Sequence, residues 1–442
     1  MAEITYICKR TVVSTKPVLR EKSYIPSVLD RVMEQSHLNI LYYFEIPNRG
    51  DVGEMTKRLS QSLSELLTYF PVVTGRLIKN KEGHWTIKCN DAGVRVVEAN
   101  AKGSVQEWLK LVDREMELKL VCWEEMFHKP YFWSTFYVQL TEFEEGGLAI
   151  GLSCFHLLAD LTCASIFIKA WFDITLSGKM LDPPLFSTLP RRRPDNCPNH
   201  KPYTDLIDHY KSSIQKSHLL ADTKYATVTL SFSDPMVRAC MAEASGPNHT
   251  SPSPFDALSG LLWCCTSEVK GLRNELIDMS ICVDLRKILG LDKEFFGNCM
   301  VCNKVQTMSL KENKLSDAAK AIGEAVANMD IDGIMDLIEW LEGNDCHSSP
   351  LMNSFNLICT SLETVNPYLA MFEEGYNPTR VSYSCEPVVG LGQVMILPSP
   401  PGEGPLSRVV MVTLPEDEIV KVCEDDMILR FSPTFLMGAG RK

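Results

Sequence analysis

The sequence predicts an α/β protein of two domains, and three observations support that prediction. The chain has 442 residues, a length that ordinarily divides into more than one domain. Both halves alternate β-branched apolar runs, which are typical of strands, with segments whose apolar residues recur at helical spacing. A proline-rich stretch from Pro183 to Pro202 separates the halves. We therefore expect an N-terminal domain over residues 1–190, a linker or crossover over 191–220 and a C-terminal domain over 221–442.

The first half opens with a predicted helix and a predicted hairpin. Residues 54–67 place leucines on one helical face, and Pro71 follows soon after the last of them. The alternating runs 84–89 and 94–99 are separated by the turn-forming residues 90–93, which predicts that the two strands pair as a hairpin. Residues 104–116, around Trp108, are expected to form a further helix.

Two strands and a helix follow in the part of the chain that carries the most chemistry. Residues 136–140 and 148–154 have strand character, and Gly146 and Gly147 turn the chain between them. The second strand leads directly into residues 155–160. After Asp160 an apolar helix is expected to run as far as Gly178.

The second half is predicted to mix strands and helices in a similar proportion. The expected strands lie at 225–232, 279–286, 354–362, 380–385, 392–399 and 408–414, and the expected helices at 235–244 and 255–269.

The charge and the hydropathy pattern exclude several classes of protein. Lys and Arg number 44 and Asp and Glu 56, which gives a formal charge of −12. Such an acidic chain is not expected to bind nucleic acid in bulk or to adhere to anionic membranes. No run of about 18 apolar residues is present, so no membrane-spanning segment is expected. Neither end resembles a secretory or lipid signal, and we expect a cytoplasmic protein.

The 16 cysteines lie scattered through apolar runs. We interpret them as reduced thiols that act as small hydrophobic residues. Cys299 and Cys302 form one C-x-x-C pair, and Cys264 and Cys265 are adjacent, but no second pair stands at the spacing of a zinc site. We therefore expect no metal.

The strongest candidate for chemistry is His156 with Asp160. A histidine at the end of a strand is held by rigid scaffolding, and its ordinary pKa of about 6.5 suits a general base. The plain alternative is a buried, hydrogen-bonded core histidine, since an H-x-x-x-D pattern is weak by itself. Two metal ligands at helical spacing are a further interpretation, which the preceding strand pattern and the lack of a third ligand oppose.

Three further residues bear on this candidate, one beside it and two in the second half of the chain. Cys154 lies two positions before His156 on the same strand and could belong to a Cys–His hydrolase, but no neighbouring residue in the sequence would lower its pKa. In the second half, Asp284 and Arg286 end a predicted strand. Arg286 could form a buried ion pair with Asp160, which would make the carboxylate structural and leave His156 to act as the base.

At this point the chain resembles a known family, the BAHD plant acyltransferases. The resemblance runs nearly end to end and rests on several motifs in the family's order. They are Tyr69-Phe70-Pro71 through Gly75-Arg76-Leu77, His156-Leu157-Leu158-Ala159-Asp160, Ser253-Pro254-Phe255-Asp256-Ala257-Leu258 before Trp263, Asp284-Leu285-Arg286, and Phe296-Gly297-Asn298.

The resemblance implies a chloramphenicol acetyltransferase-like fold and an activity. Two mixed-sheet domains related by a pseudo-twofold would enclose a tunnel, and His156 would face it. His156 would take a proton from a hydroxyl or amine acceptor, which then attacks an acyl-CoA thioester. Acyl-CoA is thus expected as a co-substrate, with no permanently bound cofactor, and a monomer is expected. Asp160 would pair with Arg286 as a structural lock, and Ser251 and Ser253 would lie near the pantetheine and phosphate of CoA.

One departure from the family suggests a second function. The family's late DFGWG motif, which is mainly structural, is replaced here by Phe372-Glu373-Glu374-Gly375-Tyr376-Asn377-Pro378. This replacement resembles the eceriferum-type branch, as do residues 89–99 and 146–160. The resemblance to that branch implies a non-catalytic modulator of very-long-chain fatty-acid elongation, a fatty-acid elongase as partner, and a place at the surface of the endoplasmic reticulum.

Overall fold

The computed structural model describes residues 3–16, 23–47, 53–81, 83–125, 132–190, 204–215, 223–246, 251–272, 275–306, 314–344, 357–388 and 390–438. The chain divides into two compact units, each built on a mixed β-sheet with helices. The predicted α/β class with two mixed-sheet domains is thereby confirmed. The first unit comprises residues 1–188, 292–298 and 367–386, and the second comprises 189–291, 299–366 and 387–442.

The units are not continuous in sequence, which differs from the predicted boundaries. The first change of unit, after Thr188, lies close to the expected end of the N-terminal domain at 190. Residues 292–298 and 367–386 then return to the first unit. For the later stretch the cause is strand pairing, because its strand Arg380–Glu386 bonds antiparallel to the strand His37–Phe44. Sequence order alone does not reveal such a return.

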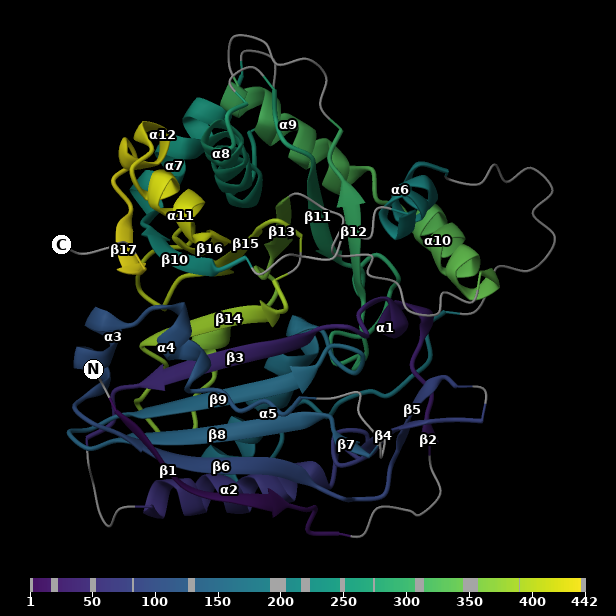
Figure 1. The fold of residues 1–442 in the computed structure, drawn as a ribbon, viewed down its shortest axis with the longest axis vertical. Coiled ribbons are helices and arrows are strands. Elements are labelled where there is room, and N and C mark those ends of the chain that lie inside the picture. Colours follow the sequence, from purple (N-terminus) through teal and green to yellow (C-terminus); the bar gives the residue numbers. More distant parts are fainter. Residues whose placement is uncertain are drawn as a thin grey trace. The chain divides into compact units, whose positions relative to one another are not determined.

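The main sheet of the first unit has six strands (Figure 1). Only the pairing of β6 with β8 is parallel, and β9 is buried along its whole length. The predicted strands at 136–140 and 148–154 correspond to β8 and β9, which pair antiparallel as expected. In sheet order the strands are β1 (Ile4–Val12), β6 (Val94–Ala101), β8 (Phe136–Phe143), β9 (Leu148–Phe155), β3 (His37–Phe44) and β14 (Arg380–Glu386).

The first unit also contains a smaller antiparallel sheet, and the predicted hairpin over residues 84–99 is wrong because its two strands belong to different sheets. The order of the smaller sheet is β2 (Ser23–Tyr24), β5 (Trp85–Lys88), β4 (Arg76–Lys79) and β7 (Trp133–Ser134). Strand β5 pairs with β2 and β4, whereas β6 pairs with β1 and β8 in the main sheet. The turn before β6 therefore carries the chain from one sheet to the other. Gly93 has a φ of +80° and lies against the Val12 carbonyl, which leaves no room for a side chain.

The helices of the first unit begin and end where local signals place them. Helix α2 matches the prediction and buries Leu59, Leu63 and Leu66, and α5 matches it too, ending at Gly178 with a φ of 70°. The predicted helix around Trp108 is instead two short helices, because Asp113 begins a second one with its own cap. The helices are α1 (Val28–Val32), α2 (Glu54–Leu67), α3 (Val105–Leu111), α4 (Arg114–Leu118), α5 (Leu161–Ser177) and a 3₁₀ turn at Pro367–Leu369.

The second unit contains a seven-stranded mixed sheet. Its strands β11, β13 and β15 run parallel, and the other pairings are antiparallel. In sheet order the strands are β12 (Met300–Lys304), β11 (Met279–Asp284), β13 (Leu357–Ser361), β15 (Gln393–Pro398), β16 (Arg408–Pro415), β10 (Tyr225–Phe232) and β17 (Thr434–Met437).

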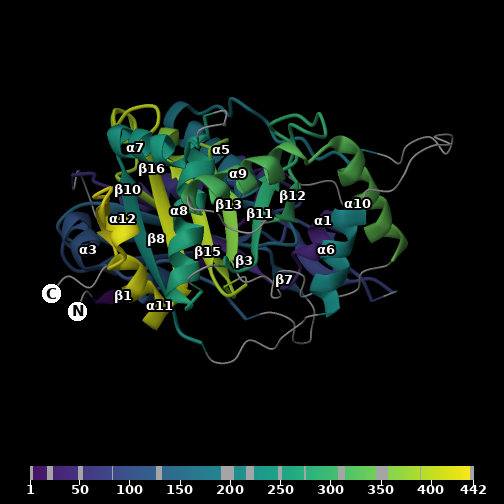
Figure 2. The same ribbon diagram turned by 90° about the horizontal axis from the view of Figure 1, so that it is seen from above.

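Seven helices of the described residues accompany this sheet. Figure 2 shows α7, α8 and α9 spread along it, and α8 lies at the centre of the core, with a buried face that includes Leu258, Leu262 and Trp263. Helix α6 lies inside the expected linker, so residues 204–215 are helical there. The helices are α6 (Thr204–Gln215), α7 (Asp234–Ala244), α8 (Pro254–Val269), α9 (Lys314–Ala327), α10 (Ile331–Gly343), α11 (Glu416–Cys423) and α12 (Asp426–Leu429).

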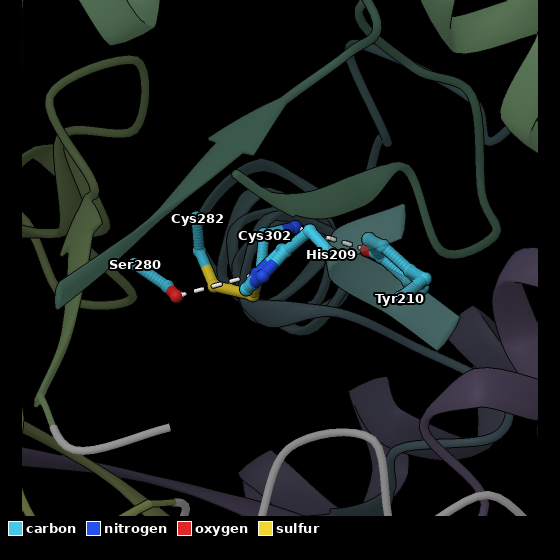
Figure 3. Close-up of a disulfide and its surroundings, with 5 residues drawn as sticks. All are labelled: His209, Tyr210, Ser280, Cys282 and Cys302. Carbon is cyan, nitrogen blue, oxygen red and sulfur yellow. Dashed lines mark hydrogen bonds between the residues drawn. A yellow bond between two sulfur atoms is a disulfide. The ribbon is translucent and has the colours of Figure 1, made fainter. Parts of the chain in front are cut away.

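A disulfide joins Cys282 and Cys302, which corrects the prediction that the cysteines are all reduced (Figure 3). The two residues stand directly opposite each other on β11 and β12, with Cα atoms 4.2 Å apart. Helix α6 contributes neighbouring groups: Tyr210 accepts a hydrogen bond from the Cys302 main chain at 3.1 Å, and His209 lies 3.4 Å from Ser280. Cys302 therefore pairs across the sheet and not with Cys299, which carries a buried thiol.

Candidate active site

His156 occupies the first position after β9, as the sequence predicts. Its main-chain N–H donates to the Ser36 carbonyl at 3.0 Å. The main-chain N–H of Leu158 donates to the Phe155 carbonyl at 2.9 Å, which closes a turn around the histidine. The histidine side chain is buried, with 7% of the residue exposed. A ring fixed at the end of a fully buried strand has little freedom to move, which suits a catalytic group.

Asp160 is the cap of helix α5. Its Oδ1 accepts a hydrogen bond from the main-chain N–H of Cys163 at 2.8 Å, and its backbone is extended, as an N-cap requires. The carboxylate is completely buried. The four-residue spacing from His156 thus corresponds to one tight turn followed by the start of a helix, and not to two positions on one helical face.

Asn298 holds one nitrogen of the His156 ring. The Nδ1 atom of His156 lies 3.0 Å from Oδ1 of Asn298. The amide Nδ2 of Asn298 donates to the His156 carbonyl at 2.7 Å. Both residues are buried. Asn298 therefore contacts His156 twice, once at the ring and once at the main-chain carbonyl.

The loop of residues 292–298 carries Asn298 and is fastened to the first unit by several contacts. Phe296 donates its main-chain N–H to the Leu185 carbonyl at 2.9 Å. Gly297 donates to the Cys163 sulfur at 3.1 Å, next to the helix start that Asp160 caps. The Phe296 ring packs edge-on against Phe70, with 5.4 Å between ring centroids. These contacts fix the asparagine relative to the histidine.

Asp30, in helix α1, lies behind Asn298. Its Oδ1 accepts from the Asn298 main chain at 2.9 Å and from Asn298 Nδ2 at 2.7 Å. Its Oδ2 accepts from the Ser27 main chain at 2.7 Å and from the Tyr24 hydroxyl at 3.3 Å. Asp30 is fully buried. Burial raises the pKa of Asp30, and the hydrogen bonds from Asn298 and Ser27 oppose that rise.

Both histidines near this site favour the neutral form. Burial lowers the pKa of His156, against the opposing effects of its own main chain, Asp160, Asn298 and the Ala159 main chain. Burial and the nearby His156 lower the pKa of His37 to about 4. His37 begins β3 and stacks on Trp123, with 4.0 Å between ring centroids. Near neutral pH an uncharged His156 can accept a proton, which is the state a general base needs.

Cys154 does not have the properties of a nucleophile. It is buried in β9, and burial together with the nearby Asp160 and Cys385 raises the pKa of its thiol. A nucleophilic cysteine requires a lowered pKa. The Cys–His hydrolase interpretation is therefore not supported.

The remaining predicted site residues lie in the second unit or outside the described residues. Arg286 is buried, and its Nη1 lies 2.8 Å from Oδ2 of Asp284. Its pairing with Asp160 would join the two units and stays a prediction. Ser253 caps helix α8, where it accepts from the Asp256 main chain at 3.1 Å, and Ser251 is exposed just before it. The three consecutive arginines of the expected linker, Arg191–Arg193, could contact a CoA phosphate or belong to a solvated linker, and they lie outside the described residues.

The described part of the chain contains neither a cluster of metal-binding side chains nor a membrane-spanning helix. No group of three or more His, Cys, Asp or Glu residues there is arranged to hold a metal ion. No described helix is both long enough and apolar enough to cross a bilayer.

Comparison with known proteins identifies the family. A family model described as "Transferase family" matches residues 2–428. The chain belongs to this family, that of the BAHD acyltransferases. It is similar to Protein ECERIFERUM 26-like of Arabidopsis thaliana, with 27% identity over 420 residues, 93% of this chain and 92% of the relative. It is also similar to rosmarinate synthase of Plectranthus scutellarioides, with 26% identity over 378 residues, 80% of this chain and 84% of the relative.

Solved structures share the BAHD fold with this chain. The crystal structure of vinorine synthase superposes with a TM-score of 0.73 at 19% identity, covering 95% of this chain and 96% of that chain. TRI101 of F. sporotrichioides, complexed with coenzyme A and T-2, superposes with a TM-score of 0.67 at 16% identity, covering 94% of this chain and 100% of that chain. At these identities the likeness concerns the fold.

The BAHD segment that contains Arg76 has a structural role in this chain. Arg76 is buried and donates to three main-chain carbonyls, those of Gly75 at 2.9 Å, Gly93 at 2.7 Å and Ala92 at 2.6 Å. It holds the turn that carries the chain between the two sheets of the first unit. Three of its five N–H donors bind main-chain carbonyls, so this segment supports the fold.

The segment that replaces the late BAHD motif has anchors of its own. Phe372 is fully buried and packs against Phe44 and Phe172, with 4.7 and 5.2 Å between ring centroids. Arg58, on α2, donates to the Phe372 carbonyl at 2.7 Å and pairs with Glu373 at 2.6 Å. The altered sequence is thus fastened to the first unit.

Reasoning from the sequence missed three residues of this site. Asn298 lies in a BAHD motif that does not reveal its contact with His156, and nothing in the sequence around Asp30 or His37 indicates a role at this site. Ser27 and Asp30 form the S-x-x-D pattern of a helix start, which the structure realises as a capping box. That signal predicts the cap but not the bond from Asp30 to a residue 268 positions away.

Proposed function

We propose that this chain transfers an acyl group from a coenzyme A thioester to the hydroxyl or amine of a small-molecule acceptor, with His156 as the general base. The observation that supports this most directly is the bond from His156 Nδ1 to Asn298, which orients a neutral ring. Membership of the BAHD family supports the reaction class. The TRI101 structures with coenzyme A support the donor class.

The reaction needs one base and no covalent enzyme intermediate. Nε2 of His156 takes the proton from the acceptor, whose oxygen or nitrogen attacks the thioester carbonyl carbon. The tetrahedral intermediate collapses with cleavage of the carbon–sulfur bond. The proton held by His156 passes to the departing CoA thiolate, so the ring ends the cycle neutral. Donors near the carbonyl oxygen would stabilise the oxyanion.

The other predicted residues have supporting roles in this proposal. Asp160 caps α5 directly after the histidine turn, and its predicted ion pair with Arg286 would hold that turn in place. Ser251 and Ser253 would lie beside the pantetheine and phosphate of CoA. Because the Ser253 hydroxyl already caps α8, Ser251 is the more available of the two for a ligand contact.

The test uses purified protein as a single component. The protein is incubated with a panel of acyl-CoAs, such as acetyl, aromatic and long-chain thioesters, together with alcohol and amine acceptors, and release of free thiol is followed. Thermal unfolding in the presence of each thioester reports binding, since a ligand that binds only the native state raises Tm. We expect at least one thioester to raise Tm and to release thiol in an acceptor-dependent manner. Neither effect with any thioester would contradict the proposal.

A second candidate function is supported by a different observation. Segment 372–378 replaces the late BAHD motif, and curated relatives include proteins named ECERIFERUM 26-like, ECERIFERUM 26 and ECERIFERUM 2. This pattern supports a non-catalytic modulator of very-long-chain fatty-acid elongation, with an elongase as partner at the endoplasmic reticulum. We favour the enzymatic function because the bonds that orient His156 are complete.

The two functions make opposite predictions for one variant. In plant cells that depend on this protein, His156→Ala abolishes the biological effect of an acyltransferase but leaves that of a modulator intact. A modulator also co-purifies with a membrane-bound condensing enzyme. For the enzymatic function we propose a cytoplasmic monomer, which fractionation and gel filtration test.

A further inference from the structure

A continuous chain of buried hydrogen bonds runs from Asp30 through Asn298 to His156. Asp30 Oδ1 lies 2.7 Å from Asn298 Nδ2, and Asn298 Oδ1 lies 3.0 Å from His156 Nδ1. All three residues belong to the first unit, although they come from helix α1, the loop 292–298 and the end of β9. At most 7% of any of the three is exposed. Water therefore competes little for these bonds.

The contacts allow only one orientation of the Asn298 amide. Its nitrogen has two protons, and two acceptors stand at 2.7 Å, Oδ1 of Asp30 and the His156 carbonyl. If the amide were rotated by 180°, its oxygen would face both of those oxygens and no bond would form with either. The amide oxygen must therefore face the histidine ring.

That orientation fixes the proton on the ring. An amide oxygen can only accept, so the Nδ1 atom facing it must carry a proton. A neutral imidazole has one such proton, and the other nitrogen, Nε2, then holds the lone pair. The general base of the proposed reaction is thus Nε2.

Asp30 has the contacts of a carboxylate and not of a carboxylic acid. Four donors point at its two oxygens: the main chains of Ser27 and Asn298, the Asn298 amide and the Tyr24 hydroxyl. Three of these donors are N–H groups that cannot accept, and this set of bonds favours the ionised carboxylate against the burial that raises the pKa of Asp30. A negative charge here polarises the Asn298 amide and makes its oxygen a better acceptor.

We propose that Asp30 is a positioning residue, whose carboxylate orients the Asn298 amide and thereby keeps His156 in the tautomer with the proton on Nδ1 and the lone pair on Nε2. This inference rests on the proposed function, which gives the Nε2 lone pair its use. The polarised amide also stabilises the imidazolium that forms when Nε2 takes up a proton. The charge of Asp30 thus acts on the ring through one intervening side chain.

The test reads the tautomer directly and needs no turnover. Protein labelled with ¹⁵N in the histidine rings is examined by NMR at neutral pH, and His156 is assigned among the nine histidines by its absence from His156→Gln. In the wild type we expect a proton on Nδ1 and none on Nε2. In Asn298→Ala we expect the second tautomer to appear beside the first, and in Asp30→Asn we expect it to a smaller extent, because the His156 carbonyl still holds the Asn298 amide there.

A control variant separates this effect from a loosened helix start. Ser27 and Asp30 together cap α1, and the Ser27 hydroxyl accepts from the Asp30 main chain at 3.1 Å. Ser27→Ala removes this cap while it leaves the bonds to Asn298 in place, so it should keep the wild-type tautomer. Tautomer populations that shift as far in Ser27→Ala as in Asp30→Asn would overturn the inference, as would a wild-type proton on Nε2.

Kinetics provide a second measurement. With a thioester that the wild type turns over, Asp30→Asn should lower kcat several-fold while KM changes little. Only the rings with the proton on Nδ1 offer a lone pair to the acceptor, and the imidazolium loses the stabilisation that the Asp30 charge supplies. An unchanged kcat in a variant with mixed tautomers would overturn the positioning role. A wild-type protein that holds the Nδ1 proton but turns over no thioester contradicts the proposed function and not the chain of bonds.

Discussion

The side-chain oxygen of Asn298 lies 3.0 Å from Nδ1 of His156, although 142 positions separate the two residues in the chain. The contact exists because residues 292–298 leave the second unit and join the first. It turns a histidine at the end of a strand into an oriented base.

The lowered pKa of His156 predicts how activity depends on pH. The base must be unprotonated, and burial lowers its pKa below the usual 6.5 even though Asp160 and Asn298 act in the opposite direction. We therefore expect kcat/KM to stay constant as the pH falls from 8 to about 6.5 and to decline only at more acidic pH. Rate profiles with one thioester check this. A decline that begins above pH 7 would contradict it.

His37 predicts a loss of stability in acid. Its pKa is lowered to about 4, whereas an unfolded histidine has a pKa of about 6.5. The unfolded state thus binds more protons between these values, so stability is full above pH 6.5 and falls as the pH drops toward 4, by on the order of 3 kcal/mol. Urea unfolding at several pH values should show a shallower acid slope in His37→Gln. An identical slope would contradict the assignment.

Asp160 and Arg286 can be tested as a pair. Asp160→Asn keeps a good helix cap but removes the charge, so any substantial cost reflects an ionic partner. If Arg286 is that partner, the double variant with Arg286→Met should show a coupling of about 1 kcal/mol or more in a double-mutant cycle. If the two substitutions change the free energy of unfolding additively, as measured by urea unfolding, Arg286 is not the ionic partner of Asp160. Asp284→Asn is the control, since it removes the carboxylate that Arg286 contacts within its own unit and leaves residue 160 unchanged.

Phe372 tests whether the altered late segment is a packed part of the first unit. Its ring is fully buried between Phe44 and Phe172. Phe372→Ala should lower the free energy of unfolding by about 3–5 kcal/mol, whereas Phe372→Leu, which refills part of the cavity, should cost less. Similar and small losses in both variants would indicate that the segment is loosely held.

The disulfide makes a prediction of its own. Cys282 and Cys302 close a loop with a sequence separation of 20, for which the chain-entropy relation gives a stabilisation of about 3 kcal/mol. Peptide mapping under non-reducing conditions should recover this pair, and reduction should lower stability by that order. Cys299→Ala should leave the pairing unchanged. Recovery of a Cys299–Cys302 peptide would contradict the assigned pairing.

Local sequence signals predicted the helices and strands around the site. They did not predict which strands and cysteines pair when the partners lie far apart in the chain. Helix α5 was predictable because Asp160 and Gly178 mark its ends, and β8 and β9 because both are mostly apolar runs on either side of a Gly-Gly turn. The hairpin over residues 84–99 was wrong because both of its strands have better partners elsewhere in the chain. The pairing of Cys282 with Cys302 depends on strand register.

The same distinction explains the site. His156 and Asp160 were found because they are close in sequence and their residue types are chemically informative. Asn298 and Asp30 act on His156 only through tertiary contacts, and an asparagine in a loop and an aspartate in a short helix have no local signal for that role. Their distances from the ring become visible only in the folded chain.

The most direct test of the central claim compares three proteins in the thiol-release assay: wild type, His156→Ala and Cys154→Ala. The control removes a buried thiol from the same strand, two residues from the base, whose raised pKa makes it inert. We predict that His156→Ala lowers kcat by about a hundred- to ten-thousand-fold while Cys154→Ala keeps turnover within a few-fold of wild type. Unchanged turnover in a folded His156→Ala protein would contradict the assignment of His156 as the general base.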